Sequence, residues 1–516
     1  MELLRKFMDL PYVVGALAGA LILLGFAPFG LWPLIIPGLA LYFLNASYPS
    51  RSRKAVWWSG YLTGFLVELW ISYQGLGHMA LLPGAEGFSR LAHAGPIAVA
   101  FLAGGPAFGA VALLFQAVRS RLVLLNALAG ASLYTLSEMP QQLASFGYYW
   151  ASIAHPFTAF PPALTLSSIG GTFLVSFCIS WIACLVAESV LQPRAAVSAA
   201  GISAAALILL WSAGAASTNG LVEKGSVTVA SVQTDNSSPT FSQSENSLGN
   251  QARGLLAEAG NGSAGLVVFP WSLAPGAFYL DEPYRGVIRG QAITESLGAH
   301  NSRLSGAVAS GTVALVWPQV YDAREGHFYE TFQFVESGVA TAEYRKQLMH
   351  PFSDYYPHWM QALGLATRDD AITPGPSVSH TQVGSWNIGS IDCSELHRPT
   401  LARREARESD FLVSMGSDAM FNNSMTSEYS LAAARYRAAE NNIPLLRASL
   451  AGPSAIIGAD GSIIASLPKG KSGILRGDIP FYETRQQTLY NRFGLLPIGL
   501  IIVSSVAAAL IARRRY

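Results

Sequence analysis

The sequence predicts a fold in two parts, a multi-span α-helical membrane domain and a soluble α/β domain. The 516 residues are 51% hydrophobic and only 13% charged, whereas soluble domains carry about 25% charged residues. Apolar stretches fill residues 1–215, and strand-like and helix-like patterns alternate over residues 220–488. The formal net charge of +1 provides no general attraction to nucleic acid, so we expect no direct nucleic-acid partner.

Eight stretches have the composition of membrane-spanning helices, which need about 20 mostly apolar residues. They lie near residues 11–27, 30–47, 55–76, 92–117, 121–138, 168–190, 196–215 and 494–512. About seven helices therefore form the N-terminal membrane domain, residues 1–215, and residues 494–512 form a C-terminal transmembrane helix. The first stretch follows Arg5 and Lys6 as in a signal peptide, but it lacks a clear cleavage site, so we interpret it as an anchor.

Basic residues predict the orientation of these helices. They occur at both ends of the chain and at every second predicted loop, as Arg5, Lys6, Arg51, Arg53, Lys54, Arg119, Arg121, Arg194 and Arg513 to Arg515. Because Lys and Arg gather on the cytoplasmic side, both termini are predicted inside and residues 220–488 outside the cytoplasm. The opposite loop 139–167 lacks Lys and Arg and is rich in aromatic residues and proline. It is either an interfacial aromatic belt or an entrance from the lipid towards the soluble domain.

The soluble region shows alternating strand and helix patterns. Strands are predicted at 225–235, 265–270, 385–393, 410–417, 443–450 and 473–479, and helices at 242–260, 284–300, 398–409 and 427–442. Paired strands are predicted at 303–311, 313–321 and 328–338, with a hairpin at 454–467 that turns at residues 458–462. Layered α/β folds place their sites at the carboxyl ends of strands, which is where Cys393 is expected.

Cys393 and Lys346 are the candidates for chemistry. Cys393 ends an apolar strand and precedes a polar stretch, while Cys178 and Cys184 lie in an apolar segment and are interpreted as small packing residues. A cysteine nucleophile acts as its thiolate and needs a nearby base or cation; the alternative is an inert buried cysteine. Lys346, in "EYRKQLMHPFSDYYP", has the charge to stabilise an oxyanion or a thiolate, and its alternative is a solvated surface lysine. No cysteine spacing suits a metal, and we expect no cofactor.

These segments carry a resemblance to a known family. The motifs are "FAPFGLWPL" near the start, the lysine segment, "IGSIDCSE", "MGSDAMF", "AAARYRAAENNIPLLRAS" and "GADGSIIASLP", in that order. Residues 225–485 resemble the carbon–nitrogen hydrolase (nitrilase) superfamily. With its flanking apolar stretches, nearly the whole chain resembles the apolipoprotein N-acyltransferases.

The resemblance implies a nitrilase-type α-β-β-α sandwich with a Glu-Lys-Cys triad, on the periplasmic side of the bacterial inner membrane. Cys393 would accept an acyl chain from a phospholipid and pass it to the N-terminal amine of a lipoprotein, without a cofactor. Lys346 would stabilise the oxyanion, and Glu395 is the third residue assigned to catalysis. The residues assigned to substrate contact are Asp354, Trp271, Phe352 and Tyr355.

The sequence departs from this pattern at the general base. The family's glutamate follows a proline after the second strand, whereas this chain reads "VVFPWSLAPG", with Trp271 and Ser272 there. Neither side chain accepts a thiol proton near neutral pH, and losing a general base costs about 10²–10⁴ in rate. Asp281 and Glu282 could fold back to replace it. Asp392 is nearer to Cys393 in sequence, but side chains alternate along a strand, so Asp392 is expected to point away from Cys393. Ser394 also stands where the acyltransferases usually have an aromatic residue.

The chain also resembles plasmid-borne conjugal transfer proteins of the TraB type from rhizobia and agrobacteria, which implies other conjugal transfer proteins as partners. Two functions stay open: an acyltransferase with an altered base, and a catalytically inactive membrane scaffold of a transfer apparatus. A transporter is a weaker third reading. Glu68 and Glu138 are acids within predicted spans, but transport needs no large outer domain with a cysteine site.

Overall fold

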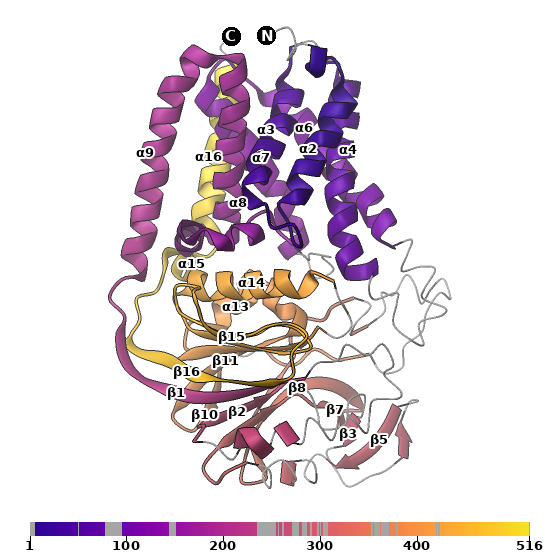
Figure 1. The fold of residues 1–516 in the computed structure, drawn as a ribbon, viewed down its shortest axis with the longest axis vertical. Coiled ribbons are helices and arrows are strands. Elements are labelled where there is room, and N and C mark those ends of the chain that lie inside the picture. The colour runs from indigo at the N-terminus through magenta and orange to yellow at the C-terminus, as the bar shows by residue number, and fades with distance from the viewer. Residues whose placement is uncertain are drawn as a thin grey trace.

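The computed structural model describes the chain in several ranges and leaves the gaps between them undescribed. The ranges are 6–49, 51–77, 95–143, 151–234, 254–255, 257–260, 263–270, 278–280, 286–288, 291–296, 299, 301–302, 308–351, 354–355, 362, 371–377, 380–418, 421 and 424–514. A bundle of helices stands on a layered α/β domain, and both termini lie at the end of the bundle remote from that domain (Figure 1).

A helix lies at each of the eight predicted apolar stretches. The helices are α2 (Pro11–Leu24), α3 (Ile35–Ser47), α4 (Arg53–Ser72), α6 (Gly105–Val118), α7 (Val123–Leu143), α8 (Pro161–Leu191), α9 (Pro193–Thr218) and α16 (Leu496–Arg514). Short helical turns accompany them: η1 (Trp32–Leu34), η2 (Tyr73–Gly77), η3 (Ala100–Gly104) and η4 (His155–Ala159). Within the described residues, four helices are long and apolar enough to cross a membrane: Gly95–Val118, Pro161–Leu191, Pro193–Thr218 and Leu496–Arg513.

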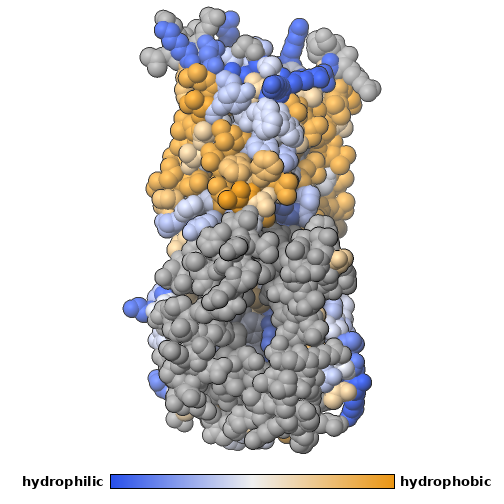
Figure 2. Space-filling model, turned by 90° about the vertical axis from the view of Figure 1, so that its right-hand side faces the viewer, coloured by the Kyte–Doolittle hydropathy of each residue, from blue (hydrophilic) through white to orange (hydrophobic). Residues whose placement is uncertain are grey.

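The surface of the helical domain is banded. On the face that Figure 2 shows, hydrophobic side chains cover most of its middle, and hydrophilic residues gather at the end away from the α/β domain. The connections after α3, α6 and α8 reach that same end, and basic residues of the sequence pattern lie in these connections or at the start of the next helix. One of these residues, Arg119, donates to the buried Glu188 carboxylate at 2.7 and 3.0 Å, which joins the α6–α7 connection to α8.

α8 is interrupted where it meets the α/β domain. Gly170 and Gly171 have non-helical backbones, and Gly171 has a φ of +71°. A Cβ at Gly171 would lie 2.8 Å from the ring of Tyr490, so the position also has no room for a side chain. The sequence pattern placed a span at 168–190, but the helix begins earlier, at Pro161, because a separate turn precedes the glycine break.

The α/β domain contains two β-sheets. The larger has the order β16-β1-β2-β6-β8-β7-β3-β5-β4, with β9 also paired to β8, and the smaller has the order β10-β11-β12-β13-β14-β15. The strands of the larger sheet are β1 (Val222–Gln233), β2 (Leu266–Phe269), β3 (Phe278–Leu280), β4 (Gly286–Ile288), β5 (Gln291–Ser296), β6 (Val313–Val316), β7 (Gln319–Asp322), β8 (His327–Glu336), β9 (Val339–Arg345) and β16 (Gly473–Thr484). Those of the smaller sheet are β10 (Thr381–Val383), β11 (Trp386–Asp392), β12 (Phe411–Ser417), β13 (Leu445–Leu450), β14 (Ser454–Ile457) and β15 (Ile463–Leu467).

The two sheets pack face to face, and helices cover their outer faces. Apolar residues of both sheets, such as Val229, Phe332, Val413 and Leu446, form one buried cluster between them. The helices α13 (Pro399–Glu405) and α14 (Thr426–Asn441) cover the smaller sheet. A helical segment within residues 254–260 packs on the outer face of the larger one. The predicted α-β-β-α sandwich and helical domain are therefore confirmed as the fold class.

Two secondary-structure predictions in the α/β domain were wrong. Residues 284–300 were predicted as a helix, but β4 and β5 lie there; glycines at 286 and 290 break the helical pattern, and the β-branched Val287, Ile288 and Ile293 favour strands. Of the predicted strand 303–311, residues 308–311 form a bend and turn, and 303–307 lie outside the described residues. The hairpin at 454–467 is confirmed by the antiparallel pair β14 and β15.

The chain enters and leaves the α/β domain side by side. α9 leads into β1, and β16 leads back through α15 (Leu489–Phe493) into α16. β1 and β16 pair antiparallel from Val222 and Thr484 to Gln233 and Gly473. The first and last strands of the α/β domain are therefore neighbours, and they lie beneath α9 and α16, the two helices that connect the domain to the bundle (Figure 1).

α14 is the contact surface between the two domains. Its Tyr429 and Tyr436 belong to the same buried apolar cluster as the helices of the bundle. The Tyr436 hydroxyl donates to the carbonyl of Ala154 at 2.7 Å, and the Thr426 hydroxyl donates to the carbonyl of Gln74 at 3.0 Å. The α/β domain is thus held on the bundle by apolar contact and by directional hydrogen bonds.

A buried ion pair strengthens this contact. Arg437 donates to Glu440 at 2.9 Å on α14, and Glu440 accepts from the backbone N–H and the hydroxyl of Thr172 on α8 at 2.7 and 3.0 Å. Both charged side chains are almost fully buried. A buried charge without its partner is strongly destabilising, so the pair fixes α14 against the break in α8.

Glu440→Leu should therefore lower the apparent melting temperature of the purified protein in detergent. The variant leaves the Arg437 guanidinium buried without its carboxylate, at a cost of about 3–5 kcal/mol. The double variant Arg437→Leu/Glu440→Leu should recover most of the loss. Glu336→Leu, at an exposed acid, serves as the control, and equal melting temperatures for all variants would contradict this role.

Candidate active site

Cys393 stands at a sharp turn between a buried strand and a short helix. β11 ends at Asp392, and η5 (Cys393–His397) begins at the next residue. The Asp392 side chain accepts from the Glu395 backbone N–H, and the Glu395 side chain accepts from the Asp392 backbone N–H at 2.8 Å. Cys393 has a φ of +45°, a left-handed conformation that non-glycine residues rarely adopt and that clusters at functional sites.

Gly416 on the neighbouring β12 leaves room for this turn. A Cβ at Gly416 would lie 3.3 Å from the Cα of Cys393 and 3.8 Å from its Sγ. The glycine therefore lets the turn pack directly against the adjacent strand.

Lys346 is a buried cation surrounded by carboxylates. It follows β9, its side chain is 1% exposed, and its Nζ lies 2.6 Å from Glu330 Oε2, 3.0 Å from Asp354 Oδ2 and 3.9 Å from Asp392 Oδ1. Antiparallel pairing of β8 and β9 brings Glu330 beside it, and the Lys346 N–H also donates to the Glu330 carbonyl at 2.9 Å. Three separate segments thus supply negative charge to one ammonium.

Glu395 ties the lysine segment to the cysteine turn. Its buried carboxylate accepts from the Tyr344 hydroxyl at 2.7 Å and from the backbone N–H groups of Gln347 and Leu348 at 2.7 and 2.8 Å. The bond from the Asp392 N–H makes a fourth donor. A carboxylate with four donors holds its neighbours in place.

Asp392 lies in the same cluster, contrary to the sequence-based expectation that strand alternation points it away from Cys393. Its Oδ2 accepts from the indole N–H of Trp317 at 3.0 Å, and its Oδ1 faces Lys346. The expectation failed because the strand ends at Asp392 and the left-handed Cys393 breaks the alternation of sides.

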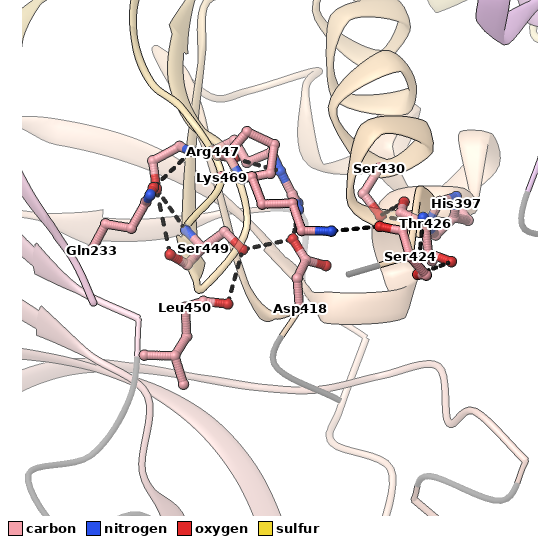
Figure 3. A network of polar contacts seen from close by, with 12 residues as sticks. Gln233, His397, Asp418, Ser424, Thr426, Ser430, Arg447, Ser449, Leu450 and Lys469 are labelled. Carbon is pink, nitrogen blue, oxygen red and sulfur yellow. Dashed lines mark hydrogen bonds and ion pairs between the residues drawn. The ribbon is translucent and has the colours of Figure 1, made fainter. Parts of the chain in front are cut away.

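A network of polar contacts holds the chain that follows β12 (Figure 3). Asp418 accepts from the Arg447 guanidinium and from the Ser449 hydroxyl, the latter at 2.7 Å. Lys469 donates to the carbonyl of Ser424, close to the start of α14. The network therefore fixes the carboxyl ends of β12 and β13, next to the cysteine turn.

A cavity of about 470 Å³ opens beside the lysine segment, at the boundary between the domains. Gln347, Leu348 and Tyr355 line one part of it, and Leu143 at the end of α7 lines another. Arg398 also lines it and donates to the carbonyl of Gln142 at 3.0 Å. The cavity is thus shared between the α/β domain and the end of a bundle helix.

Comparison with protein families decides the assignment. The family model described as carbon-nitrogen hydrolase matches residues 228–488, half of the chain, including the cysteine turn and the lysine segment. The chain belongs to the carbon–nitrogen hydrolase family. A second model, the apolipoprotein N-acyltransferase N-terminal domain, matches residues 18–185 of the helical domain.

Several curated relatives of this carbon–nitrogen hydrolase are apolipoprotein N-acyltransferases. The protein from Caulobacter vibrioides is 27% identical over 98% of this chain and 96% of its own length. That from Vibrio vulnificus is 24% identical over 98% and 97%, and that from Azotobacter vinelandii is 28% identical over 96% and 94%. Among solved structures, the chain is similar to Saccharomyces cerevisiae Nit3, with 18% identity, a TM-score of 0.38, and coverage of 50% of this chain and 91% of that chain.

The structure places several of the predicted site residues of this carbon–nitrogen hydrolase near one another. Asp354 contacts Lys346, and Glu395 accepts from the backbone N–H of the adjacent Gln347. Cys393 lies close enough for the Lys346 charge to act on its thiol, and Tyr355 lines the adjacent cavity. Trp271 and Phe352 lie outside the described residues, as do Asp281 and Glu282. Sequence analysis missed Glu330, although a single acid within the apolar strand pattern "FYETFQFV" was a signal for a buried carboxylate.

Burial and charge act in opposite directions at this site. Burial raises the pKa of the Cys393 thiol to about 12, although the Lys346 ammonium opposes the shift. For Lys346, burial acts to lower the pKa, but Asp354 and Glu330 outweigh it and hold the pKa well above its usual value. The resting site therefore pairs a charged lysine with a protonated cysteine.

Alkylation of Cys393 should follow this raised pKa. Only the thiolate reacts with iodoacetamide, so its rate should rise about tenfold per pH unit from pH 7 to pH 10, without a plateau. The rate is followed by mass spectrometry of the peptide that contains Cys393. The urea-unfolded protein is the control and should level off above an ordinary thiol pKa of about 8.5; a plateau below pH 9 in the folded protein would contradict the shift.

Proposed function

We propose that this carbon–nitrogen hydrolase is an N-acyltransferase of the bacterial inner membrane, with a phospholipid donor and the N-terminal amine of a lipoprotein as acceptor. The observation that carries the proposal is the buried Lys346 ammonium within the cluster that holds the Cys393 turn. The helical domain, the match of its residues 18–185, and full-length similarity to apolipoprotein N-acyltransferases support the membrane and the substrates.

The reaction proceeds in two acyl transfers. The Cys393 thiolate attacks the carbonyl carbon of a phospholipid ester, the C–O bond breaks, and a lysophospholipid leaves as an alcohol after taking up a proton. The acceptor amine then attacks the thioester, the C–S bond breaks, and an amide forms as the thiol is restored. In both steps the carbonyl oxygen gains negative charge, which the Lys346 ammonium stabilises.

The other residues position this pair or contact the substrate. Glu395 holds the turn through its four donors, so we assign it a positioning role in place of the catalytic role that the resemblance implied. Asp354 fixes the lysine. Tyr355, in the cavity wall, and Phe352, near it in sequence, are proposed to contact the acyl donor.

The second candidate is a membrane scaffold without catalysis, and Trp271 at the family's base position is the observation that favours it. In this reading the fold binds lipid, lipoprotein or another protein of a conjugal transfer apparatus. Service in plasmid conjugation belongs to both readings as a prediction from the resemblance to conjugal transfer proteins. The retained cysteine turn and buried lysine support the enzyme, because binding alone requires neither.

Cys393→Ala should abolish transfer of a labelled acyl chain from phospholipid to protein and then to a lipoprotein peptide, because no thioester can form. The assay uses the full-length protein in vesicles that contain labelled phosphatidylethanolamine. Cys178→Ala, at a buried cysteine of α8, is the matched control and should keep the parental rate. Equal labelling of Cys393→Ala and the parent would refute the enzyme, and absent labelling of the parent would favour the scaffold.

The α/β domain should lie on the periplasmic side, since the basic residues gather at the opposite end of the bundle. In a Cys393→Ala background, Lys471→Cys on the α/β domain should react with a membrane-impermeant maleimide in intact spheroplasts. Lys54→Cys, at the start of α4, should react only after the membrane is permeabilised; both lysines are exposed. The reverse pattern would overturn this orientation.

A further inference from the structure

The cluster around Lys346 contains more acid than base. Glu330, Asp354 and Asp392 all lie within 4 Å of the single ammonium, and Glu395 is two residues from Cys393. If all three neighbouring carboxylates were ionised, the buried cluster would carry a net negative charge. Burying uncompensated charge is costly, so such a group of acids retains a proton.

These acids differ in the hydrogen bonds that they accept. Asp354 accepts from the backbone N–H of His350 at 2.6 Å, and Asp392 accepts from the Trp317 indole and from a backbone N–H. Glu395 has four donors. Each of these three carboxylates is therefore held by donors other than the lysine.

Glu330 differs from the other acids. Its side chain is 9% exposed, and within the described part of the chain its carboxylate has one donor, the Lys346 ammonium at 2.6 Å. Burial raises its pKa, Lys346 acts against that shift, and Asp354 and Glu395 add to it. Burial also raises the pKa of Asp392 and of Glu395, so the single donor and the close contact with Lys346 are what distinguish Glu330. A buried carboxylate whose pKa moves towards neutrality suits a general base.

We propose that Glu330 is the proton acceptor of this site and acts on Cys393 through Lys346. The inference rests on the proposed acyl transfer, in which Trp271 leaves the thiol without the family's base. The S–H bond breaks as its proton passes to Lys346 Nζ, which gives up one of its own protons to Glu330 Oε2. Lysine keeps three protons, an O–H bond forms at Glu330, and the thiolate is left beside the ammonium. The same route returns the proton to the leaving oxygen.

Glu330→Gln tests this role because it keeps the shape and a hydrogen-bonding group but cannot accept the proton. Acyl transfer should fall by about 10²–10⁴-fold, the range for loss of a general base. Alkylation of Cys393 should shift to lower pH, because the removed negative charge no longer disfavours the thiolate. A merely structural role would not accelerate alkylation while slowing transfer.

Controls separate this inference from the proposed function and from misfolding. Glu336→Gln, at the exposed end of the same strand, should leave both rates unchanged. Glu330→Asp keeps the carboxylate, so its transfer rate should lie between those of Glu330→Gln and the parent. If limited proteolysis shows that Glu330→Gln is unfolded, the transfer rate of Glu330→Asp is compared with the parent instead. If the parent is active and the folded variant used for the test, Glu330→Gln or otherwise Glu330→Asp, transfers the acyl chain at the parental rate, the role of Glu330 is overturned. The proposed acyl transfer would still stand.

Asp392→Asn tests the competing acceptor. Asp392 lies next to Cys393 in sequence, but its Oδ1 is 3.9 Å from Lys346 Nζ, beyond hydrogen-bond distance. If Asp392→Asn slows transfer while speeding alkylation and Glu330→Gln does neither, the acceptor is Asp392 and the assignment to Glu330 is wrong. An inactive parent would instead mean that the proposed acyl transfer has failed.

Discussion

The burial of one ammonium organises the site. Lys346 is removed from water, and a charge in that position requires counter-charges close by. Glu330 of β8, Asp354 after β9 and Asp392 at the end of β11 supply them. Because β8 belongs to one sheet and β11 to the other, the lysine joins the two layers of the sandwich at the point where the cysteine turn begins.

The second constraint is the contact between α14 and the bundle. α14 buries apolar residues against the smaller sheet on one side and aromatic residues against the helices on the other. The chain before it is held by the Asp418 network and by Gln74, whose amide oxygen accepts from the Met425 N–H at 3.0 Å. The edge of the sandwich that holds Cys393 therefore faces the helical domain, and the cavity there is bounded by Leu143 of α7. The cavity therefore lies where the lysine segment of the α/β domain meets the end of a helix with the composition of a membrane span.

Sequence patterns predicted the fold class and the eight apolar helices, because each is encoded locally by composition or by a motif. They failed where strand pairing between segments distant in the sequence determines the structure. Residues 284–300 have a mixed periodicity, and pairing between β5, β3 and β4 resolves it as strand. Glu330 is 16 residues from Lys346, and only the register of β8 against β9 brings them together. The direction of Asp392 depended on a left-handed residue that no pattern reveals.

The charge balance of the cluster around Lys346 also bears on whether the site is catalytically active or is an inactive remnant of the family's site. Several buried carboxylates around one lysine cost stability, and apolar residues of similar size often replace such groups without loss. A scaffold that only binds lipid has no use for a buried ammonium, nor for a strained cysteine beside it. A site that must move a proton off a thiol needs both a cation to hold the thiolate and an acid with a raised pKa. The arrangement around Lys346 meets these two needs with its own residues, and on this ground we favour the enzyme over the scaffold.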